Sequence, residues 1–320
     1  MAIDEETAAL LGQLNSPEVL LNEALPNEAS PIVNARAGAD IFFSKFAGEN
    51  KRKCSVEDLE VNRSSHRVPI RIYHPKTTKT SSLLPIIVFF HGGGWSLGDV
   101  KSYDSLVSSL CDLSEVIYIS VDYRLAPECK FPTGLNDCLA VTEWALAHGA
   151  EFGGDTSRIA VMGDSAGGNF AAVIAYKLNV EKPNQIKAQF LLYPVMDNSH
   201  PHDHYNSRMV FGNGEYLLSR DGIDAAVEWH LNPSDDRADP TISPGLQNDL
   251  NVLPPTVIIV GGYDPLLDEV KKYHSDLKAS GVSSILNVYE TTIHAFLSFG
   301  VLGVAKEARR YLADQVRRLL

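Results

Sequence analysis

The sequence predicts an α/β protein built on one eight-stranded, mostly parallel sheet with helices on both faces. Apolar runs alternate with helical segments along most of the chain, as they do in βαβ units. Two segments near the start suit an antiparallel pair that opens the sheet. One apolar run leads through Gly163-Asp164-Ser165-Ala166-Gly167 directly into a helix-forming stretch. With 320 residues, 44% of them hydrophobic, the chain can bury the core of one large domain.

The expected elements follow one another in the order that this fold class requires. The antiparallel pair is expected at residues 54–62 and 68–73. The later strands are expected at residues 86–90, 116–121, 158–162, 188–193, 256–260 and 284–289. The helices between and after them are expected at residues 103–111, 134–148, 169–178, 268–280 and 304–320.

Two segments fall outside this alternation. Residues 1–50 contain amphipathic patterns such as Val19-Leu20-Leu21 before any strand, and residues 196–244 interrupt the core between two strands. We expect both segments to form a helical cap over the carboxyl edge of the strands, where ligands bind in open α/β sheets. Residues 51–195 and 245–320 then form the α/β domain itself.

Ser165 lies between two glycines at a strand-to-helix turn, which is the pattern of a nucleophile elbow. A side chain beside the serine would clash in so tight a turn, and the strained backbone pushes the serine oxygen out toward a substrate. A plain turn with a capping serine is one alternative. A phosphate-binding loop is another, but the positions that need Lys and Ser/Thr hold Asn169 and Phe170. We therefore expect Ser165 to be a nucleophile.

A glycine-rich loop, His91-Gly92-Gly93-Gly94-Trp95, follows a strand-like run upstream of the serine. Attack on a carbonyl carbon puts negative charge on the carbonyl oxygen, and N–H groups in a loop without side chains can approach that oxygen. We expect the N–H groups of Gly93, Gly94 and Ala166 to form this oxyanion hole. A dinucleotide-binding loop would need a glycine where Leu97 stands.

A serine nucleophile needs a base and an acid that orients the base, in the chain order serine, acid, histidine. His294 follows a strand and lies in a loop, whereas His230 and His274 lie in helical stretches. Asp264 follows the end of the preceding strand. Asp268 is the alternative acid, but it lies a helical turn further on. A carboxylate in the first turn of a helix is common there because it interacts favourably with the helix dipole. We expect His294 to be the base and Asp264 the acid.

Together these motifs resemble the hormone-sensitive lipase family of α/β-hydrolases, also called bacterial family IV esterases. The matching stretches are His91-Gly92-Gly93-Gly94-Trp95, Asp122-Tyr123-Arg124-Leu125-Ala126-Pro127-Glu128, Gly163-Asp164-Ser165-Ala166-Gly167-Gly168-Asn169, Tyr193-Pro194, Asp264-Pro265-Leu266 with Asp268-Glu269, and His294-Ala295-Phe296. The resemblance implies an α/β-hydrolase fold and a serine carboxylesterase for short- to medium-chain esters that needs no cofactor. It also implies that His91, together with Gly92, braces the oxyanion loop.

Two positions depart from the pattern of that family. Ala295 stands where the family usually has glycine, and Phe170 stands where it usually has leucine. Neither departure removes a catalytic atom. The added methyl group after His294 is expected to shift its loop slightly.

The same residues suit two other functions. An amidase or deacetylase of the family would use them on an N-acyl substrate, and the sequence does not separate this activity from ester hydrolysis. A non-catalytic receptor is the second alternative, because plant gibberellin receptors resemble the family but have lost the catalytic histidine. The presence of His294 disfavours the receptor.

Candidate pocket walls are apolar residues of the expected cap and of the loops beside the site, each of which has an ordinary core contact as an equal alternative. They are Phe42, Phe43, Trp95, Leu97, Tyr193, Val195, Phe211, Leu217 and Phe296. The patch His200-Pro201-His202-Asp203-His204 contains metal-ligand residue types but lacks a matched further ligand. We expect it to be a solvated cap loop and expect no metal.

Charge and composition limit the partners. The chain has 28 Lys and Arg against 40 Asp and Glu, a formal net charge of −12, which argues against nucleic acid because phosphate neutralisation needs clustered cations. A small neutral ester is the expected substrate. The first residues lack the features of a secretory signal and no run has the length of a membrane span, so we expect a cytoplasmic protein. Similar enzymes are often homodimers, and this chain is a candidate for one.

Overall fold

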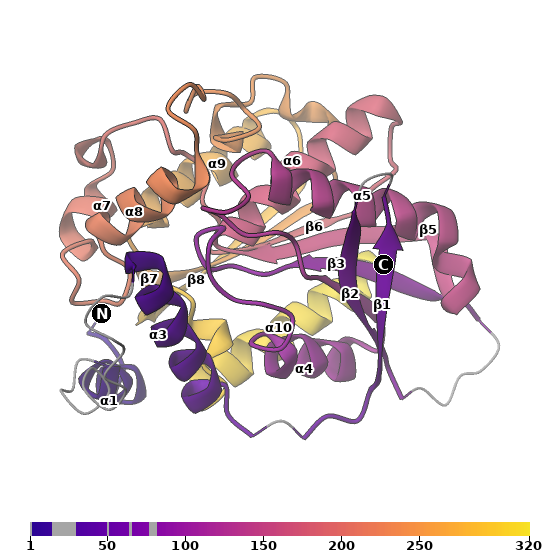
Figure 1. Ribbon diagram of the computed structural model, residues 1–320, viewed down its shortest axis with the longest axis horizontal. Coiled ribbons are helices and arrows are strands. Elements are labelled where there is room, and N and C mark those ends of the chain that lie inside the picture. Colours follow the sequence, from indigo (N-terminus) through magenta and orange to yellow (C-terminus); the bar gives the residue numbers. More distant parts are fainter. Residues whose placement is uncertain (1, 15–29, 50, 64–65, 77–81) are drawn as a thin grey trace.

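The computed structural model describes residues 2–14, 30–49, 51–63, 66–76 and 82–320, which form an eight-stranded sheet flanked by helices (Figure 1). The strand order is β1-β2-β4-β3-β5-β6-β7-β8. β2 pairs antiparallel with β1 and β4, and the other neighbours are parallel, which confirms the predicted sheet. The strands are β1 (Ser55–Asn62), β2 (Arg67–His74), β3 (Leu84–Phe90), β4 (Ile117–Val121), β5 (Gly154–Asp164), β6 (Gln189–Leu192), β7 (Thr256–Tyr263) and β8 (Ser284–Ile293).

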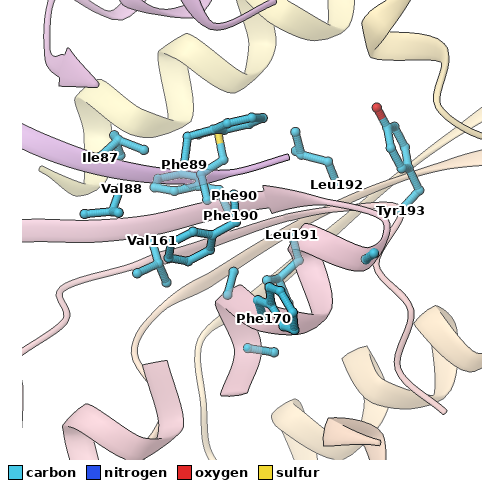
Figure 2. Close-up of a cluster of buried hydrophobic side chains, with 14 of the residues drawn as sticks. Ile87, Val88, Phe89, Phe90, Val161, Phe170, Phe190, Leu191, Leu192 and Tyr193 are labelled. Carbon is cyan, nitrogen blue, oxygen red and sulfur yellow. The ribbon is translucent and has the colours of Figure 1, made fainter. Parts of the chain in front are cut away.

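Continuously apolar strands form the centre of the sheet. Every residue of β3 after Leu84 is buried, because helices cover both faces and neither face meets water. Figure 2 shows the aromatic rings of Phe89, Phe90 and Phe190 among aliphatic side chains of β3, β5 and β6. This close-packed layer holds the strand ends, and the loops that leave them, in fixed relative positions.

Helices lie on both faces of the sheet (Figure 1). α4 (Asp104–Ser114) and α10 (Gly303–Leu319) pack together on one face, and α5 (Thr133–His148), α6 (Ala166–Glu181) and α9 (Leu267–Ala279) cover the other. Each of the five predicted helices begins and ends within three residues of these bounds. Among the described residues, none of the helices has the length and apolar character needed to cross a membrane.

Within the described ranges, four further α-helices lie outside the βα alternation, in the two segments predicted to form a cap. They are α1 (Glu5–Leu14), α3 (Pro31–Phe46), α7 (Asn206–Phe211) and α8 (Arg220–His230). α1 docks beside the end of β8, where the Thr7 hydroxyl lies 3.1 Å from the Thr292 hydroxyl. Residues 15–29, which include the predicted Val19-Leu20-Leu21 pattern, lie outside the described residues. The division of the chain into cap and α/β domain stays a prediction.

We expect a large loss of stability when an aromatic side chain is removed from the core. Phe190 is fully buried in β6, so Phe190→Ala should lower the free energy of unfolding by about 3–5 kcal/mol through lost burial and the cavity left behind. Urea unfolding followed by circular dichroism measures this loss. Val180→Ala, at a position 53% exposed on α6, is the control and should cost less than about 0.5 kcal/mol. Similar losses in the two variants would contradict the prediction.

Candidate active site

Ser165 lies on the turn between β5 and α6, with backbone angles of φ 53° and ψ −116°. A positive φ is rare for a residue with a side chain, and packing on both sides of the turn enforces it here. A Cβ atom on Gly163 would collide with the carbonyl of Gly167, and one on Gly167 would collide with the carbonyl of Phe90 at the end of β3. Only glycine therefore fits at these two positions, as the elbow pattern predicts.

The structure brings Ser165, His294 and Asp264 into one hydrogen-bonded chain. The Ser165 Oγ atom lies 3.0 Å from His294 Nε2, and His294 Nδ1 lies 2.7 Å from Asp264 Oδ2. These residues follow β5, β8 and β7, whose carboxyl ends meet at one edge of the parallel sheet. Asp264 is fully buried, and its other oxygen accepts the N–H of Leu266 at 2.9 Å, which fixes the carboxylate.

The alternative acid and bases have other partners. Asp268 accepts the N–H of Ser207 at 2.8 Å, and His274 lies 2.8 Å from the hydroxyl of Ser284. The His230 ring stacks on Trp95 with ring centroids 4.4 Å apart, and burial lowers the pKa of His230 to about 3. His230 is therefore a neutral packing residue at physiological pH.

The loop after β3, which the sequence predicts to form an oxyanion hole, contains two glycines in the left-handed region. Gly93 and Gly94 both have positive φ, at 103° and 58°, a conformation that glycine adopts without strain. In the described part of the chain, the N–H groups of Gly93, Gly94 and Ala166 donate to no protein acceptor. All three residues are thus free to donate to an oxygen placed beside Ser165.

His91 and Gly92, to which the resemblance assigns the support of this loop, both contact residues outside it. The His91 ring stacks on Tyr123 with centroids 4.3 Å apart, and the Tyr123 hydroxyl donates to the His91 carbonyl at 2.7 Å. Gly92 N–H donates to Asp164 Oδ1 at 2.7 Å, and the Tyr103 hydroxyl donates to the other oxygen of Asp164 at 3.1 Å. Asp164, beside Ser165, therefore ties the loop after β3 to the turn between β5 and α6.

The loop that carries His294 shows why glycine is usual at the next position. Ala295 has φ 60° and ψ 12°, in the left-handed region that disfavours a Cβ atom. The loop nevertheless leaves His294 within hydrogen-bonding distance of both its partners. The alanine is accommodated in the left-handed conformation, with its side chain beside the cavity described next.

A cavity of about 330 Å³ opens beside Ser165 and His294. Its walls combine the strand-end loops with residues of α3 and α8, and most of them are apolar. The lining residues are Ala35, Phe43, Gly93, Gly94, Trp95, Leu97, Tyr103, Asp164, Ser165, Val195, Asn198, Leu218, Gly222, Ile223, Ala225, Ala226, Val227, Trp229, Leu266, His294 and Ala295. α8 also touches the oxyanion loop, because a Cβ atom on Gly94 would lie 2.8 Å from the Cβ atom of Ala226.

Four of the nine predicted pocket walls line this cavity, namely Phe43, Trp95, Leu97 and Val195. The other five, Phe42, Tyr193, Phe211, Leu217 and Phe296, lie outside its lining and make packing contacts. Phe42 stacks edge-on against Phe299, Phe211 packs on Tyr263, and Phe296 packs behind Tyr193. Tyr193 stacks edge-on against the ring of His294 with centroids 5.0 Å apart and so supports the base from behind.

Six lining residues that the sequence did not predict lie on α8. Ser219 caps this helix by accepting the N–H of Gly222 at 3.0 Å, which fixes where its turns begin. Ile223, Ala226 and Val227 are three and four residues apart and so share one helix face. That apolar spacing is visible in the sequence and would have indicated the face that turns inward.

The histidine-rich patch is held by hydrogen bonds and stacking. His200 Nδ1 lies 2.6 Å from Asp197 Oδ2, and its ring stacks on that of His204 with centroids 4.0 Å apart. His202 Nε2 lies 3.1 Å from Asp224 Oδ1. Among the residues that the structure describes, no group of three or more His, Cys, Asp or Glu side chains has the arrangement of a metal site.

Comparison with known proteins identifies the family. The sequence profile of a family with the α/β-hydrolase fold matches residues 87–298. The chain belongs to the α/β-hydrolase family. This α/β hydrolase is 39% identical to the carboxylic ester hydrolase LipN of Mycobacterium tuberculosis, over 78% of this chain and 66% of LipN. It is 30% identical to the ethyl acetate hydrolase of Pseudomonas putida, over 100% of this chain and 99% of that protein.

A solved structure gives the same result for the fold. An ester hydrolase from the metagenome of Lake Arreo, complexed with a derivative of bipyridine phosphonate, superposes on this α/β hydrolase with a TM-score of 0.90. The two chains are 30% identical, and the match covers 99% of this chain and 98% of the other. The α/β-hydrolase fold and the resemblance drawn from the sequence motifs are confirmed.

The buried carboxyl group of Asp164 predicts a pH-dependent stability. Burial raises its pKa from 3.8 to about 7, so the folded state binds this proton more tightly than the unfolded chain does. Its contribution to stability is therefore full below about pH 4 and is lost as the pH rises to about 7. Between about pH 5 and about pH 8, the free energy of unfolding of the wild type should fall by about 2 kcal/mol relative to that of Asp164→Asn.

Urea unfolding at the two pH values measures this difference. Asp221→Asn, at an exposed position on α8, removes a carboxylate of the same kind and is the control. It should follow the pH dependence of the wild type. Parallel behaviour of Asp164→Asn and the wild type would contradict the prediction.

Proposed function

We propose that this α/β hydrolase is a serine carboxylesterase, with Ser165 as nucleophile, His294 as general base and Asp264 as the group that orients the base. The observation that carries the proposal is the continuous chain of contacts from Ser165 Oγ through the imidazole to the buried carboxylate, at 3.0 and 2.7 Å. Ester hydrolysis is also the activity named for relatives at 39% and 30% identity.

The first half of the reaction acylates the enzyme. Ser165 Oγ attacks the ester carbonyl carbon while His294 Nε2 takes the hydroxyl proton. The negative charge that develops on the carbonyl oxygen is stabilised by the N–H groups of Gly93, Gly94 and Ala166. His294 then gives the proton to the departing alcohol oxygen, and the acyl group stays on Ser165.

The second half repeats these steps with water. His294 takes a proton from water, and the resulting hydroxide attacks the acyl carbon on Ser165. Collapse of the tetrahedral intermediate returns the proton to Ser165 Oγ and releases the carboxylic acid. Asp264 keeps the imidazole in the tautomer that presents Nε2 to the serine, and its charge stabilises the imidazolium that forms in each half.

The cavity supports small, neutral esters as substrates. At about 330 Å³ it is near the lower end of the range for small-molecule sites, and its walls on α3 and α8 are apolar. Short- to medium-chain acyl groups suit this volume. None of the described residues that line the cavity is a lysine or arginine, so the lining offers no ammonium or guanidinium group to recognise an anionic substrate.

Replacing the nucleophile gives the direct test. Ser165→Ala should lower kcat/KM for p-nitrophenyl acetate by at least about 10⁴-fold, because attack on the carbonyl has no other oxygen in place. Steady-state hydrolysis of p-nitrophenyl esters from acetate to decanoate measures this loss, and far-UV circular dichroism checks that the variant is folded. Retention of wild-type turnover by the folded variant would contradict the proposal, and turnover of p-nitroacetanilide without ester turnover would favour an amidase.

The cavity wall predicts acyl-chain preference. Leu218 lines the cavity, so Leu218→Ala should deepen it and raise the ratio of kcat/KM for octanoate to that for acetate by about tenfold. The neighbouring Leu217 lies outside the lining, which makes Leu217→Ala a matched control that should leave the ratio unchanged. The same panel of p-nitrophenyl esters measures both variants. An equal shift of this ratio in the two variants would contradict the assignment of Leu218, and not Leu217, to the cavity wall.

A further inference from the structure

A second cavity, of about 260 Å³, lies between α4, α10 and the segment that joins α3 to β1. It shares no lining residue with the cavity beside Ser165. Its charged lining consists of six cationic side chains and two carboxylates: Lys51, Arg52, Lys53, Lys306, Arg309 and Arg310 against Glu49 and Asp112. This cationic cavity is opposite in sign to the whole chain, whose formal net charge is −12.

Both carboxylates of the lining already have partners. Glu49 pairs with Lys51 at 3.1 Å. The two oxygens of Asp112 accept the backbone N–H groups of Lys53 and Cys54 at 2.8 and 2.7 Å, so main-chain donors hold this carboxylate. In the described part of the chain, neither acid forms an ion pair with a cation on α10.

Four cations of the cavity have no carboxylate partner among the described residues: Lys53, Lys306, Arg309 and Arg310. Arg52, in contrast, reaches Asp104 at 3.2 Å. Cations gathered around a concave surface repel one another. An anion bound between them attracts each of them and so offsets that repulsion.

Arg309 is the strongest sign that the cavity has an occupant. Its side chain is only 5% exposed, and Nε and Nη2 both donate to the Leu297 carbonyl, at 3.0 and 2.6 Å. Nη1 donates to no acceptor in the described part of the chain, and it lies beside Gly300, which lines the cavity. Burial lowers the pKa of Arg309 to about 10. A buried charge without a counter-charge is costly, and an anion in the cavity would remove that cost.

We propose that the cationic cavity binds a phosphoryl group, carried either by a small free anion such as pyrophosphate or by the headgroup of an anionic lipid. A phosphoryl group offers several acceptor oxygens and more than one negative charge, which matches Lys53, Lys306, Arg310 and the Nη1 group of Arg309. The side chain of Ser109 on α4 lines the same cavity and adds a hydroxyl donor.

The position of the cavity links its occupant to the active site. Arg309 holds the carbonyl of Leu297, which is three residues after His294. The backbone of Gly300 packs directly against the carbonyl of Ala47, the residue that follows α3. A bound phosphoryl group therefore contacts the two segments that carry the catalytic histidine and one wall of the substrate cavity.

Isothermal titration calorimetry tests the proposal by measuring the affinity of the full chain for sodium pyrophosphate at constant ionic strength. The double variant Lys306→Gln/Arg310→Gln removes two exposed cations of the cavity and leaves Arg309 in place, because Arg309 also holds Leu297. The matched control is Lys182→Gln/Lys271→Gln, which removes the same charge at exposed positions on α9 and at the end of α6. We expect one site per chain, at least about tenfold weaker binding in the cavity variant and a change below about twofold in the control.

Co-sedimentation with phosphatidylglycerol vesicles distinguishes the source of the group. Saturable pyrophosphate binding that depends on Lys306 and Arg310 supports a free anion. Vesicle binding with the same dependence, and no pyrophosphate binding, supports a lipid headgroup. The absence of both, or an equal loss in the cavity and control variants, overturns the proposal. None of these readouts uses ester hydrolysis, so the result is independent of the proposed activity.

Discussion

The close approach of the first turn of α6 to β3 and β5 is the constraint on which the rest of the site depends. It exists only because Gly163 and Gly167 have no side chains, since a Cβ atom at either position would collide with backbone. The approach forces Ser165 into its positive φ and turns its oxygen toward His294. Because Gly167 packs on the carbonyl of Phe90, the same contact sets the distance between Ser165 and the loop after β3.

Two buried aspartates extend this constraint to the neighbouring loops. Asp164 accepts donors from the loop after β3 and from the Tyr103 hydroxyl, and Asp264 joins the loop after β7 to His294. In each case a carboxylate at one strand end accepts from a group outside its own loop. A side chain held in this way has little freedom, which is what preorganised catalysis requires. The two carboxyl groups differ in partner, and only Asp264 contacts the imidazole.

The sequence was sufficient for the parts of the molecule that depend on local pattern. The nucleophile elbow, the oxyanion glycines and the chain order of acid and histidine each have a signature of a few residues, and Ser165, Asp264 and His294 lie together as predicted. The pocket walls were harder, because they depend on how helices far apart in sequence dock on the sheet. Leu217 was predicted to be a pocket wall, but its neighbour Leu218 lines the cavity instead. A shift of one residue turns a side chain away, and composition does not reveal it.

Directional polar contacts fix the docking that the sequence left open. Apolar packing alone would let helices such as α3 and α7 slide, whereas ion pairs and hydrogen bonds fix their register. Arg36 on α3 pairs with Glu128 through two contacts of 2.8 and 2.7 Å and donates to the Ser96 carbonyl at 3.0 Å. Arg208 on α7 pairs with Glu269, and both of these side chains are buried. An arginine thus helps to tie each of these helices to the strand-and-helix core, and Ser207 on α7 adds a backbone hydrogen bond to Asp268.

The two attachments differ in strength because they differ in exposure. The side chains of Arg36 and Glu128 are 30% and 59% exposed, and a pair open to water contributes at most about 1 kcal/mol. Loss of one partner from the buried pair of Arg208 and Glu269 would leave the other charge buried and unpaired. This would lower the free energy of unfolding by about 3–5 kcal/mol. The ion pair that attaches α3 is therefore the weaker of the two. α3 supplies Ala35 and Phe43 to the cavity wall, so this ion pair helps to position one wall of the cavity.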